Sequence, residues 1–500
     1  MTTHRIDDAR ARLDAVARPD GLRDETGELL AADLVAAVAA AFVDEMDAGE
    51  AGAGEVLLGH DRAGLPAELA AAVVRGVQAR GATIVDLGAC PTDLARFASG
   101  RLATPAIMIA AGPGPDGAVG LGFLRAGAED LTVHTGLDAV LDRAAHYLAE
   151  GLAPVASPAS LREVDLLPDY AATLLALVDL AGIRPLTVVV DAGHGAAAVT
   201  IPAVFGTDSG PGSSPAAGTT PLPITVIPLS FDAGADAEGR PQEIDPFDPG
   251  SLVDLRNAVV ANAADLGLGF DSDAGRCVVI EENGVLVDPS AIGALLARRA
   301  IARERARRPG PVAAPDTAPD ILVAHSLIVS LRVPETIEAA GAIPVRTESA
   351  PALLRARMRD DGAVFGCGHA ADYYFREFCD SGSGLLAALN LLAELGGQAH
   401  PLSELAVEFS PYARSGEISS PVEDLPDAYA GIVEAYTGVA EFDELDGLTV
   451  TGMTSADEPF WWFNVRPSQT EPLLRLTVEA ATPAAMIRVR DEVLALIRGE

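Results

Sequence analysis

Residues 268–277 read LGFDSDAGRC, and they place two carboxylates, Asp271 and Asp273, one residue apart. Oxygen ligands at such a spacing are those that a hard cation such as Mg²⁺ takes in proteins. A third carboxylate two residues further on would complete the set, but position 275 is glycine. The stretch is therefore either a weak two-carboxylate metal site, or a solvated acidic turn that closes the strand 266–270.

A second group of polar residues lies near the C-terminus, where residues 464–475 read NVRPSQTEPLLR. Arg466 and Arg475 each offer a planar fork of N–H donors to an anion, and the hydroxyls of Ser468 and Thr470 add further donors. This composition predicts a phosphate-binding loop between two strands. The alternative is an ordinary turn whose polar side chains satisfy the backbone.

Composition limits the classes of function. The chain has 500 residues, of which 49% are hydrophobic, so it can fold as several domains with sizeable cores. Its formal net charge of −37 opposes binding to nucleic acid or to anionic membranes. No lysine is present, which excludes Schiff-base chemistry and a Walker lysine. The polar N-terminus has no signal-like apolar region, so we expect a cytoplasmic protein.

The elements that must position these residues follow a repeated order. Apolar strands at 54–61, 186–191 and 321–331 are each followed by a polar or glycine-rich loop and an amphipathic helix. This alternation predicts three α/β domains with mixed, mostly parallel sheets. The C-terminal part differs, because strands at 445–453, 459–468 and 473–481 precede a helix at 483–499; it predicts a smaller α+β domain.

This domain order resembles that of the α-D-phosphohexomutases, the phosphomannomutases and phosphoglucomutases, from about Asp20 to the C-terminus. The stretch VVVDAGHGAAAVTIPAVF is similar to the opening of that family's second domain, and NVRPSQTEPLLR is similar to its phosphate-binding motif. The resemblance implies a four-domain α/β architecture. The domain boundaries are then 1–155 (phosphoserine loop), 156–281 (metal loop), 282–402 (sugar-binding loop) and 403–500 (phosphate-binding domain).

Several family loops have lost their chemistry in this chain. A serine that carries the phosphoryl group is expected at 110–115, which reads AAGPGP, so Gly112 stands at the nucleophile position. A phosphoryl relay needs an atom that accepts phosphate, and glycine has none. The third metal aspartate is missing at Gly275, and Gly368 replaces the glutamate of the sugar loop. Arg23, Arg276 and His369 are what the resemblance leaves as substrate-cleft residues.

These departures predict a phosphohexomutase-like protein of hexose-phosphate metabolism without mutase activity. We expect it to bind a sugar phosphate or another small anion through its C-terminal loop, as a monomer or dimer, with a regulatory role such as partnering an active mutase paralogue. Magnesium is implied by the resemblance, with Asp271 and Asp273 as the remnant ligands. The alternative is an active phosphohexomutase that moves phosphate between C1 and C6 of mannose or glucose phosphate.

Overall fold

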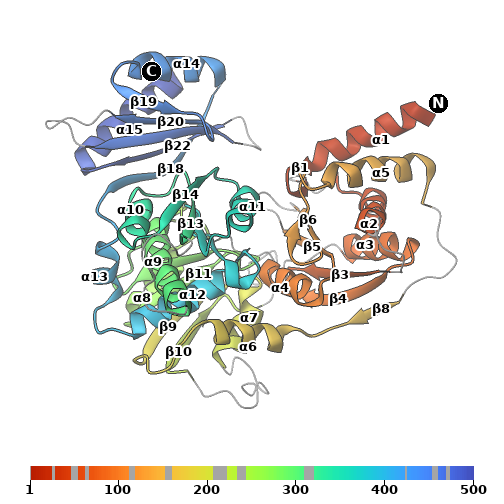
Figure 1. The fold of residues 1–500 in the computed structure, drawn as a ribbon, viewed down its shortest axis with the longest axis horizontal. Coiled ribbons are helices and arrows are strands. Elements are labelled where there is room, and N and C mark those ends of the chain that lie inside the picture. Colours follow the sequence, from red (N-terminus) through yellow and green to blue (C-terminus); the bar gives the residue numbers. More distant parts are fainter. Residues whose placement is uncertain are drawn as a thin grey trace. The chain divides into compact units, whose positions relative to one another are not determined.

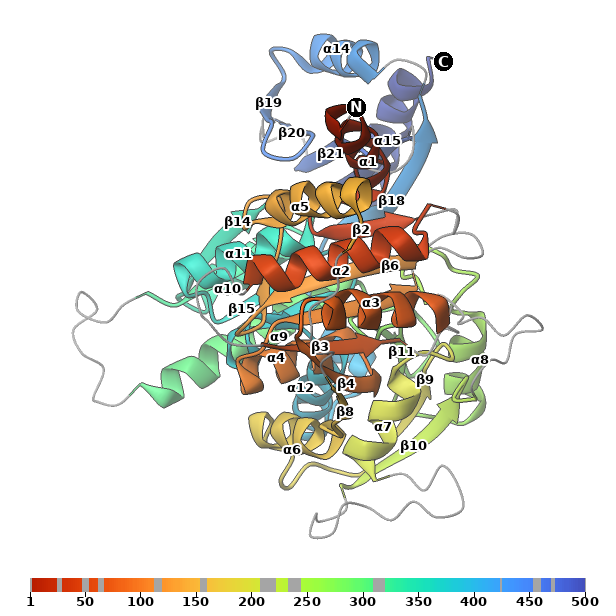
Figure 2. The same ribbon diagram turned by 90° about the vertical axis from the view of Figure 1, so that its right-hand side faces the viewer.

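The computed structural model (Figures 1 and 2) divides into two compact units. The first unit consists of Met1–Asp245, Gly250–Gly284 and Glu377–Ala399, and the second consists of Pro246–Pro249, Val285–Arg376 and His400–Glu500. No helix among the described residues is long and apolar enough to span a membrane. The structure describes residues 2–24, 29–46, 54–61, 67–111, 119–152, 160–206, 222–232, 244–308, 320–422, 425–452, 460–468 and 473–499.

The first sheet of the first unit is mixed, with the strand order β1-β2-β6-β5-β3-β4-β8 and β7 paired to β6. β3 lies parallel to both β4 and β5, while β6 runs antiparallel to β5. Parallel strands buried on both faces read as apolar runs, as VLL does in the third strand. The strands are β1 (Ala17–Arg18), β2 (Gly21–Asp24), β3 (Glu55–His60), β4 (Thr83–Ala89), β5 (Ala106–Ala111), β6 (Val119–Arg125), β7 (Glu129–Asp130) and β8 (Leu161–Glu163).

The helices around this sheet form by burying apolar faces. The sequence of α2 is apolar nearly all round, which suits a helix covered by its neighbours α3 and α5. Phe42 of α2 meets Phe123 of β6 at a centroid distance of 5.5 Å, so the helix layer packs directly on the sheet. The helices are α1 (Thr2–Val16), α2 (Ala32–Met46), α3 (Ala67–Ala79), α4 (Thr92–Leu102), α5 (Leu137–Glu150) and α6 (Leu167–Leu177).

The second sheet of this unit has the order β10-β9-β11-β12. β9 lies between two parallel neighbours, whereas β11 and β12 form an antiparallel hairpin whose connection is the acidic stretch 271–276. All five residues of β11 are buried. The elements are β9 (Leu186–Asp191), β10 (Ile224–Leu229), β11 (Leu266–Phe270), β12 (Cys277–Glu281), α7 (Ala197–Phe205), α8 (Val253–Ala261) and α12 (Gly384–Gly396). The two-residue strand β17 (Ser381–Gly382) is also part of the first unit but not of this sheet.

In the second unit, β13 lies parallel to β14 and β15, and β16 pairs antiparallel with β15. The cross-strand pair Phe365 and Phe375 stacks edge to face at 5.3 Å and helps to fix this register. The elements are β13 (Leu322–Ser326), β14 (Ile343–Thr347), β15 (Phe365–Cys367), β16 (Tyr373–Phe375), α9 (Pro289–Arg307), α10 (Arg332–Ala339), α11 (Pro351–Asp361) and α13 (Leu402–Val407), with a 3₁₀ turn at Arg376–Phe378.

The C-terminal sheet is entirely antiparallel, with the order β18-β22-β21-β20-β19. Its core side chains, among them the fully buried Phe463, pack against α14 and α15. Figure 1 shows both helices beside this sheet. The predicted α+β domain is thereby confirmed. The elements are β18 (Ala413–Pro421), β19 (Ala440–Asp443), β20 (Leu448–Gly452), β21 (Trp461–Pro467), β22 (Leu473–Ala480), α14 (Leu425–Tyr436) and α15 (Pro483–Arg498).

Candidate functional site

Two arginines of the C-terminal sheet lie directly opposite one another. Arg466 of β21 and Arg475 of β22 are cross-strand partners in the antiparallel register. Like charges at opposed positions destabilise a strand pair unless an anion compensates them. The hairpin therefore sets two guanidiniums at a fixed spacing and requires a negative group beside them.

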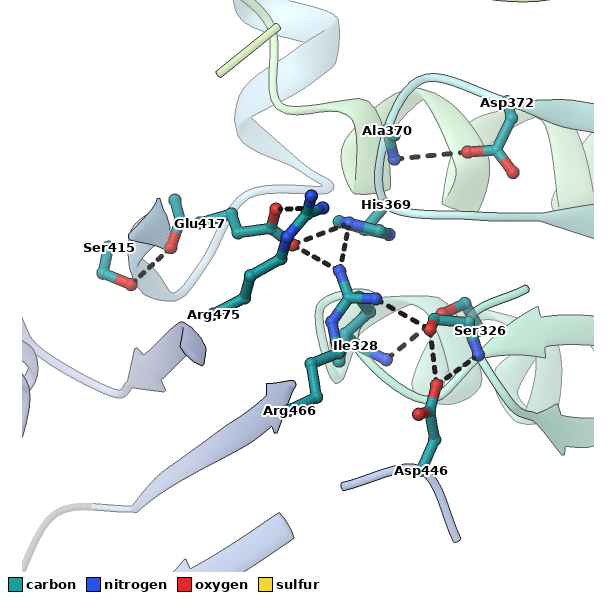
Figure 3. Close-up of polar contacts among 12 residues, drawn as sticks. Ser326, Ile328, His369, Ala370, Asp372, Ser415, Glu417, Asp446, Arg466 and Arg475 are labelled. Carbon is teal, nitrogen blue, oxygen red and sulfur yellow. Dashed lines mark hydrogen bonds and ion pairs between the residues drawn. The ribbon is translucent and has the colours of Figure 1, made fainter. Parts of the chain in front are cut away.

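Glu417 of β18 supplies that negative group (Figure 3). Its Oε2 accepts a hydrogen bond from Nη2 of Arg466, and its Oε1 accepts one from Nη1 of Arg475 at 3.1 Å. The Nε2 of His369 lies 3.3 Å from the same Oε2. One carboxylate thus bridges both arginines, an arrangement in which charge-assisted hydrogen bonds are strong.

An irregularity in β18 turns the Glu417 side chain toward the arginines. The pairing of β18 with β22 skips between Arg414 and Glu417, which marks a β-bulge. Gly416 within it has a φ of 69°, a left-handed conformation that glycine adopts without strain. The Oγ of Ser415 accepts a hydrogen bond from the backbone N–H of Val478 at 2.9 Å, so the bulge is anchored to β22.

The other side of Arg466 is held by a serine and an aspartate. Nη1 of Arg466 donates to Oγ of Ser349 at 2.8 Å. Ser349 in turn donates both its backbone N–H, at 2.9 Å, and its hydroxyl to Asp446. The orientation of the Arg466 guanidinium is therefore fixed from two directions, by Ser349 and by Glu417.

Electrostatics keep Glu417 ionised and His369 neutral. Burial alone would raise the pKa of Glu417, but the hydrogen bond from His369 and the charges of Arg466 and Arg475 lower it to about 2. Burial lowers the pKa of His369, and the Arg466 charge acts in the same direction. The imidazole also stacks on Phe247 at 5.4 Å. At neutral pH the cluster therefore contains two positive guanidiniums, one carboxylate and an uncharged histidine.

Of the two hydroxyl residues predicted to bind phosphate, only Ser468 falls among the described residues. Its backbone N–H donates to the carbonyl of Leu473 at 2.8 Å, which closes the β21–β22 hairpin. Ser468 is half-buried. Thr470 lies outside the described residues. The structure thus brings Arg466, Arg475 and His369 together, and places Ser468 at the end of the same strand.

The acidic turn of the first unit has a different character. Oδ1 of Asp271 accepts the backbone N–H of Arg276 at 2.9 Å, and Oδ2 accepts the guanidinium Nε at 2.6 Å. Oδ2 of Asp273 accepts the hydroxyl of Thr92 at 2.7 Å. Burial, with the nearby charge of Asp273, raises the pKa of Asp271 to about 7. Each carboxylate is therefore already engaged by donors of the protein.

This donor set does not fit a resident Mg²⁺ ion. Mg²⁺ requires near-octahedral oxygen ligands and commonly takes one or two carboxylates. Here the Arg276 guanidinium already binds the Asp271 carboxylate. The described residues also contain no group of three or more His, Cys, Asp or Glu placed to hold a metal. Weak Mg²⁺ binding at Asp271 and Asp273 stays a prediction.

Three further predicted positions lie apart from the Arg466 and Arg475 pair or outside the described residues. Arg23 lies on β2 and is half-buried. Gly112, at the predicted nucleophile position, lies outside the described residues. Arg276 belongs to the acidic turn, where it pairs with Asp271 rather than standing ready for a ligand.

Sequence reasoning missed several residues that the fold places in these clusters. Glu417, Ser349 and Asp446 surround Arg466, although they come from separate segments. The only local signal is the Ser-Gly pair before Glu417, which is typical of a bulge. In the first unit, Asp93 was also missed. It is buried next to Thr92 and accepts a hydrogen bond from the Tyr170 hydroxyl at 2.8 Å.

Comparisons with known proteins agree with this architecture. Residues 15–138 match the family description "Phosphoglucomutase/phosphomannomutase, alpha/beta/alpha domain I", residues 288–412 match its domain III, and residues 417–496 match its C-terminal domain. A protein of Xanthomonas campestris named "Phosphohexose mutases" is 30% identical over 485 residues, covering 96% of this chain and 98% of that protein. The chain therefore belongs to the phosphoglucomutase/phosphomannomutase family, the α-D-phosphohexomutases.

Further relatives support the same four-domain fold. A phosphomannomutase of Escherichia coli is 28% identical over 487 residues, covering 95% of this chain and 98% of that protein. The crystal structure of a phosphoglucomutase/phosphomannomutase family protein from Burkholderia thailandensis has a TM-score of 0.77 at 20% identity, covering 97% of this chain and 98% of that one. Both the family and the fold class predicted from the sequence are confirmed.

Proposed function

We propose that this protein binds a phosphorylated sugar, or another small phosphate monoester, through Arg466 and Arg475 and does not interconvert hexose phosphates. The observation that carries the binding proposal is the convergence of both guanidiniums on the single carboxylate of Glu417. A pair of arginines that already holds one anion has the donor geometry that phosphate oxygens require. Resemblance of residues 466–475 to the family motif supports the same assignment.

The absence of turnover is proposed from the sequence at the expected nucleophile. Gly112 offers no oxygen to receive a phosphoryl group, and no Ser, Thr, Cys or His occurs in residues 110–125. The pairing of Asp271 with Arg276 supports the same conclusion, because it leaves less carboxylate for a metal that would stabilise transferring phosphate. A retained ligand site without turnover suits a regulatory protein, such as a partner of an active family member.

One observation favours a second function. The relatives that match over nearly the whole chain carry the names of phosphohexose mutases and phosphomannomutases. An active mutase would need another phosphate acceptor in place of Gly112. A coupled assay with mannose 1-phosphate or glucose 1-phosphate, Mg²⁺ and a bisphosphate activator separates the two functions. Turnover in the ordinary enzyme range, about 1–10³ s⁻¹, would establish the second.

The binding proposal is tested by calorimetry and by thermal unfolding with the 1- and 6-phosphates of mannose and glucose. A ligand present at a hundredfold excess over its Kd stabilises the protein by about 2.7 kcal/mol, which is readily measured. Unphosphorylated mannose and glucose serve as controls and should give no shift. Absence of binding by every phosphorylated sugar at millimolar concentration would show that the arginine pair serves the fold alone. Mixing the protein with an active mutase and following turnover tests the regulatory role.

A further inference from the structure

The Glu417 carboxylate occupies the hydrogen-bonding groups that a phosphate ligand would need. Arg466 directs Nη1 to Ser349 and Nη2 to Glu417, and Arg475 directs Nη1 to the other oxygen of Glu417. A tetrahedral phosphate that bridged both arginines would compete for the same N–H groups. The two anions cannot both hold this position.

The charge balance points in the same direction. Glu417 is surrounded by positive groups and the neutral His369, and only 8% of its side chain is exposed. Asp446 contributes a second negative charge through Ser349. With Arg466 and Arg475 matched by these two carboxylates, an incoming phosphate dianion meets little uncompensated positive charge. A protein whose net charge is −37 adds no long-range attraction.

We propose that Glu417 is an internal competitor for phosphate, a carboxylate that holds the arginine pair in the unliganded protein and must leave at least one guanidinium when a phosphate monoester binds both. This inference rests on the proposed function, because it assumes that the arginine pair is the phosphate site. Glu417 would then control phosphate affinity, because the two arginines without this carboxylate would bind phosphate more tightly.

The surroundings of Glu417 permit such a displacement. Arg475 is the more open of the two partners, with 34% of its side chain exposed against 13% for Arg466. A phosphate would therefore contact Arg475 first and could replace Oε1 of Glu417 as the acceptor of the Arg475 hydrogen bond. Gly416 precedes Glu417 in the bulge, and a side chain added there would meet no atom within 4 Å. The space beside Gly416 is therefore open.

A rival arrangement leaves Glu417 in place. Phosphate would then bind only the outward N–H groups of Arg475, and Glu417 would help by keeping both guanidiniums oriented. The two arrangements predict opposite effects of removing the Glu417 charge. Competition predicts tighter phosphate binding, whereas orientation predicts weaker binding.

The test uses Glu417→Gln in the full chain, titrated with inorganic phosphate and with mannose 1-phosphate in a calorimeter. The amide keeps the size of the side chain and still accepts hydrogen bonds from arginine, but it is a weaker partner than the carboxylate. We expect affinity for both probes to rise by roughly ten- to a hundredfold, the effect of one or two charge-assisted hydrogen bonds. Without ligand the variant should unfold at a lower temperature than the parent.

Glu304→Gln is the matched control. Glu304 also bridges two arginines, Arg376 at 2.7 Å and Arg308 at 3.5 Å, and its replacement changes the net charge equally. It lies outside the Arg466 cluster and should leave phosphate affinity unchanged. A rise of equal size in the control would assign the effect to net charge and overturn the proposal.

Glu417→Asp provides a second measurement if the glutamine variant folds poorly. Aspartate keeps the charge but is too short to bridge both arginines as Glu417 does, so phosphate affinity should rise by a smaller factor. Binding by the parent, with equal or weaker binding by both variants, would overturn the internal competitor and leave the phosphate site standing. No binding by the parent or by either variant would overturn the phosphate site and the competitor together.

Discussion

The Asp271 carboxylate is held at both oxygens by Arg276, through the backbone N–H at 2.9 Å and the guanidinium Nε at 2.6 Å. The Arg276 guanidinium thus binds the carboxylate that would otherwise be available to a metal cation. Asp273, two residues away, accepts the hydroxyl of Thr92 from α4. Both carboxylates of the hairpin turn are therefore engaged by donors of the protein, while Arg276 balances only one of their two negative charges.

Gly275→Asp should tighten Mg²⁺ binding by at least about tenfold relative to the parent, because a third carboxylate adds an oxygen ligand beside Asp273. A Cβ atom at position 275 would lie 3.2 Å from Oδ1 of Asp273, so the new group is placed close to that ligand. Calorimetry with Mg²⁺ alone measures the effect, with Gly275→Asn as the uncharged control. Micromolar affinity in the parent that Asp273→Ala abolishes would contradict the weak site.

Replacement of Arg466 should weaken phosphate binding according to how many N–H donors each substitution removes. Lysine keeps the charge but cannot reach Ser349 and the anion at once, so Arg466→Lys should cost roughly tenfold in affinity. Arg466→Ala should cost roughly a hundredfold or more. Calorimetry with mannose 1-phosphate checks both variants. Arg298→Ala, which removes an ion pair with Glu408 elsewhere in the second unit, should bind like the parent.

Asp93 should make stability fall as pH rises from about 4 to about 7. Burial raises its pKa to about 7, although hydrogen bonds from Ser383 and Tyr170 lower it. In this window the folded protein keeps a proton that the unfolded chain, with an ordinary carboxyl pKa near 3.9, has released. Asp93→Asn removes this dependence, so the free energy of unfolding of the variant should rise relative to that of the parent between about pH 4 and about pH 7.

Urea titrations across this pH range measure the difference. Tyr170→Phe gives a second check, because it removes a hydrogen bond that favours the ionised carboxylate and should move the upper end of the window to higher pH. A constant difference between parent and Asp93→Asn at every pH would show that Asp93 ionises in the fold as it does in the unfolded chain.

Gly447→Ala should destabilise the C-terminal domain and weaken phosphate binding. Gly447 has a φ of 67°, and a Cβ atom there would lie 2.7 Å from Cβ of Arg466. Gly438 also has a left-handed φ, of 85°, but its added Cβ would meet nothing within 4 Å. Gly438→Ala should therefore cost only the backbone strain, on the order of 1–3 kcal/mol, and Gly447→Ala more.

Thermal unfolding and phosphate titration of the two alanine variants distinguish the cost of backbone strain from the effect of displacing Arg466. Only Gly447→Ala should alter phosphate affinity, because only there does the added methyl press on the residue that holds the anion. Equal loss of stability in both variants, with unchanged phosphate affinity, would mean that the hairpin around Arg466 tolerates the methyl group by shifting elsewhere.

Three strands and the last helix of the C-terminal domain could be predicted from the sequence because their signals are local. Residues 461–467 and 473–480 alternate or run apolar over strand lengths, and Thr482 with Pro483 begins the last helix as a cap and first-turn residue. The residue type of Arg466 and Arg475 also indicated an anion partner, which in the structure is Glu417, while phosphate binding by the pair stays a prediction.

The partner of these arginines could not be predicted. Glu417 reaches them only because β18 pairs with β22 and skips one position at the bulge. Neither the strand pairing nor the bulge can be predicted from a short segment of sequence. Without the bulge, alternation along the strand would direct the side chain to the other face. The ion pair between Asp271 and Arg276 could not be predicted either, because the same sequence pattern is equally compatible with a metal-binding loop.

The opposed positions of Arg466 and Arg475 make the anion site a property of strand pairing rather than of the hairpin tip. Two neighbouring strands set the spacing of the guanidiniums, and a third strand carries their counter-charge. Such a unit could be transferred to another protein as a module. Grafted onto another antiparallel sheet with a bulged neighbour, it would carry both the arginine pair that we propose binds phosphate and the carboxylate that we propose competes with phosphate.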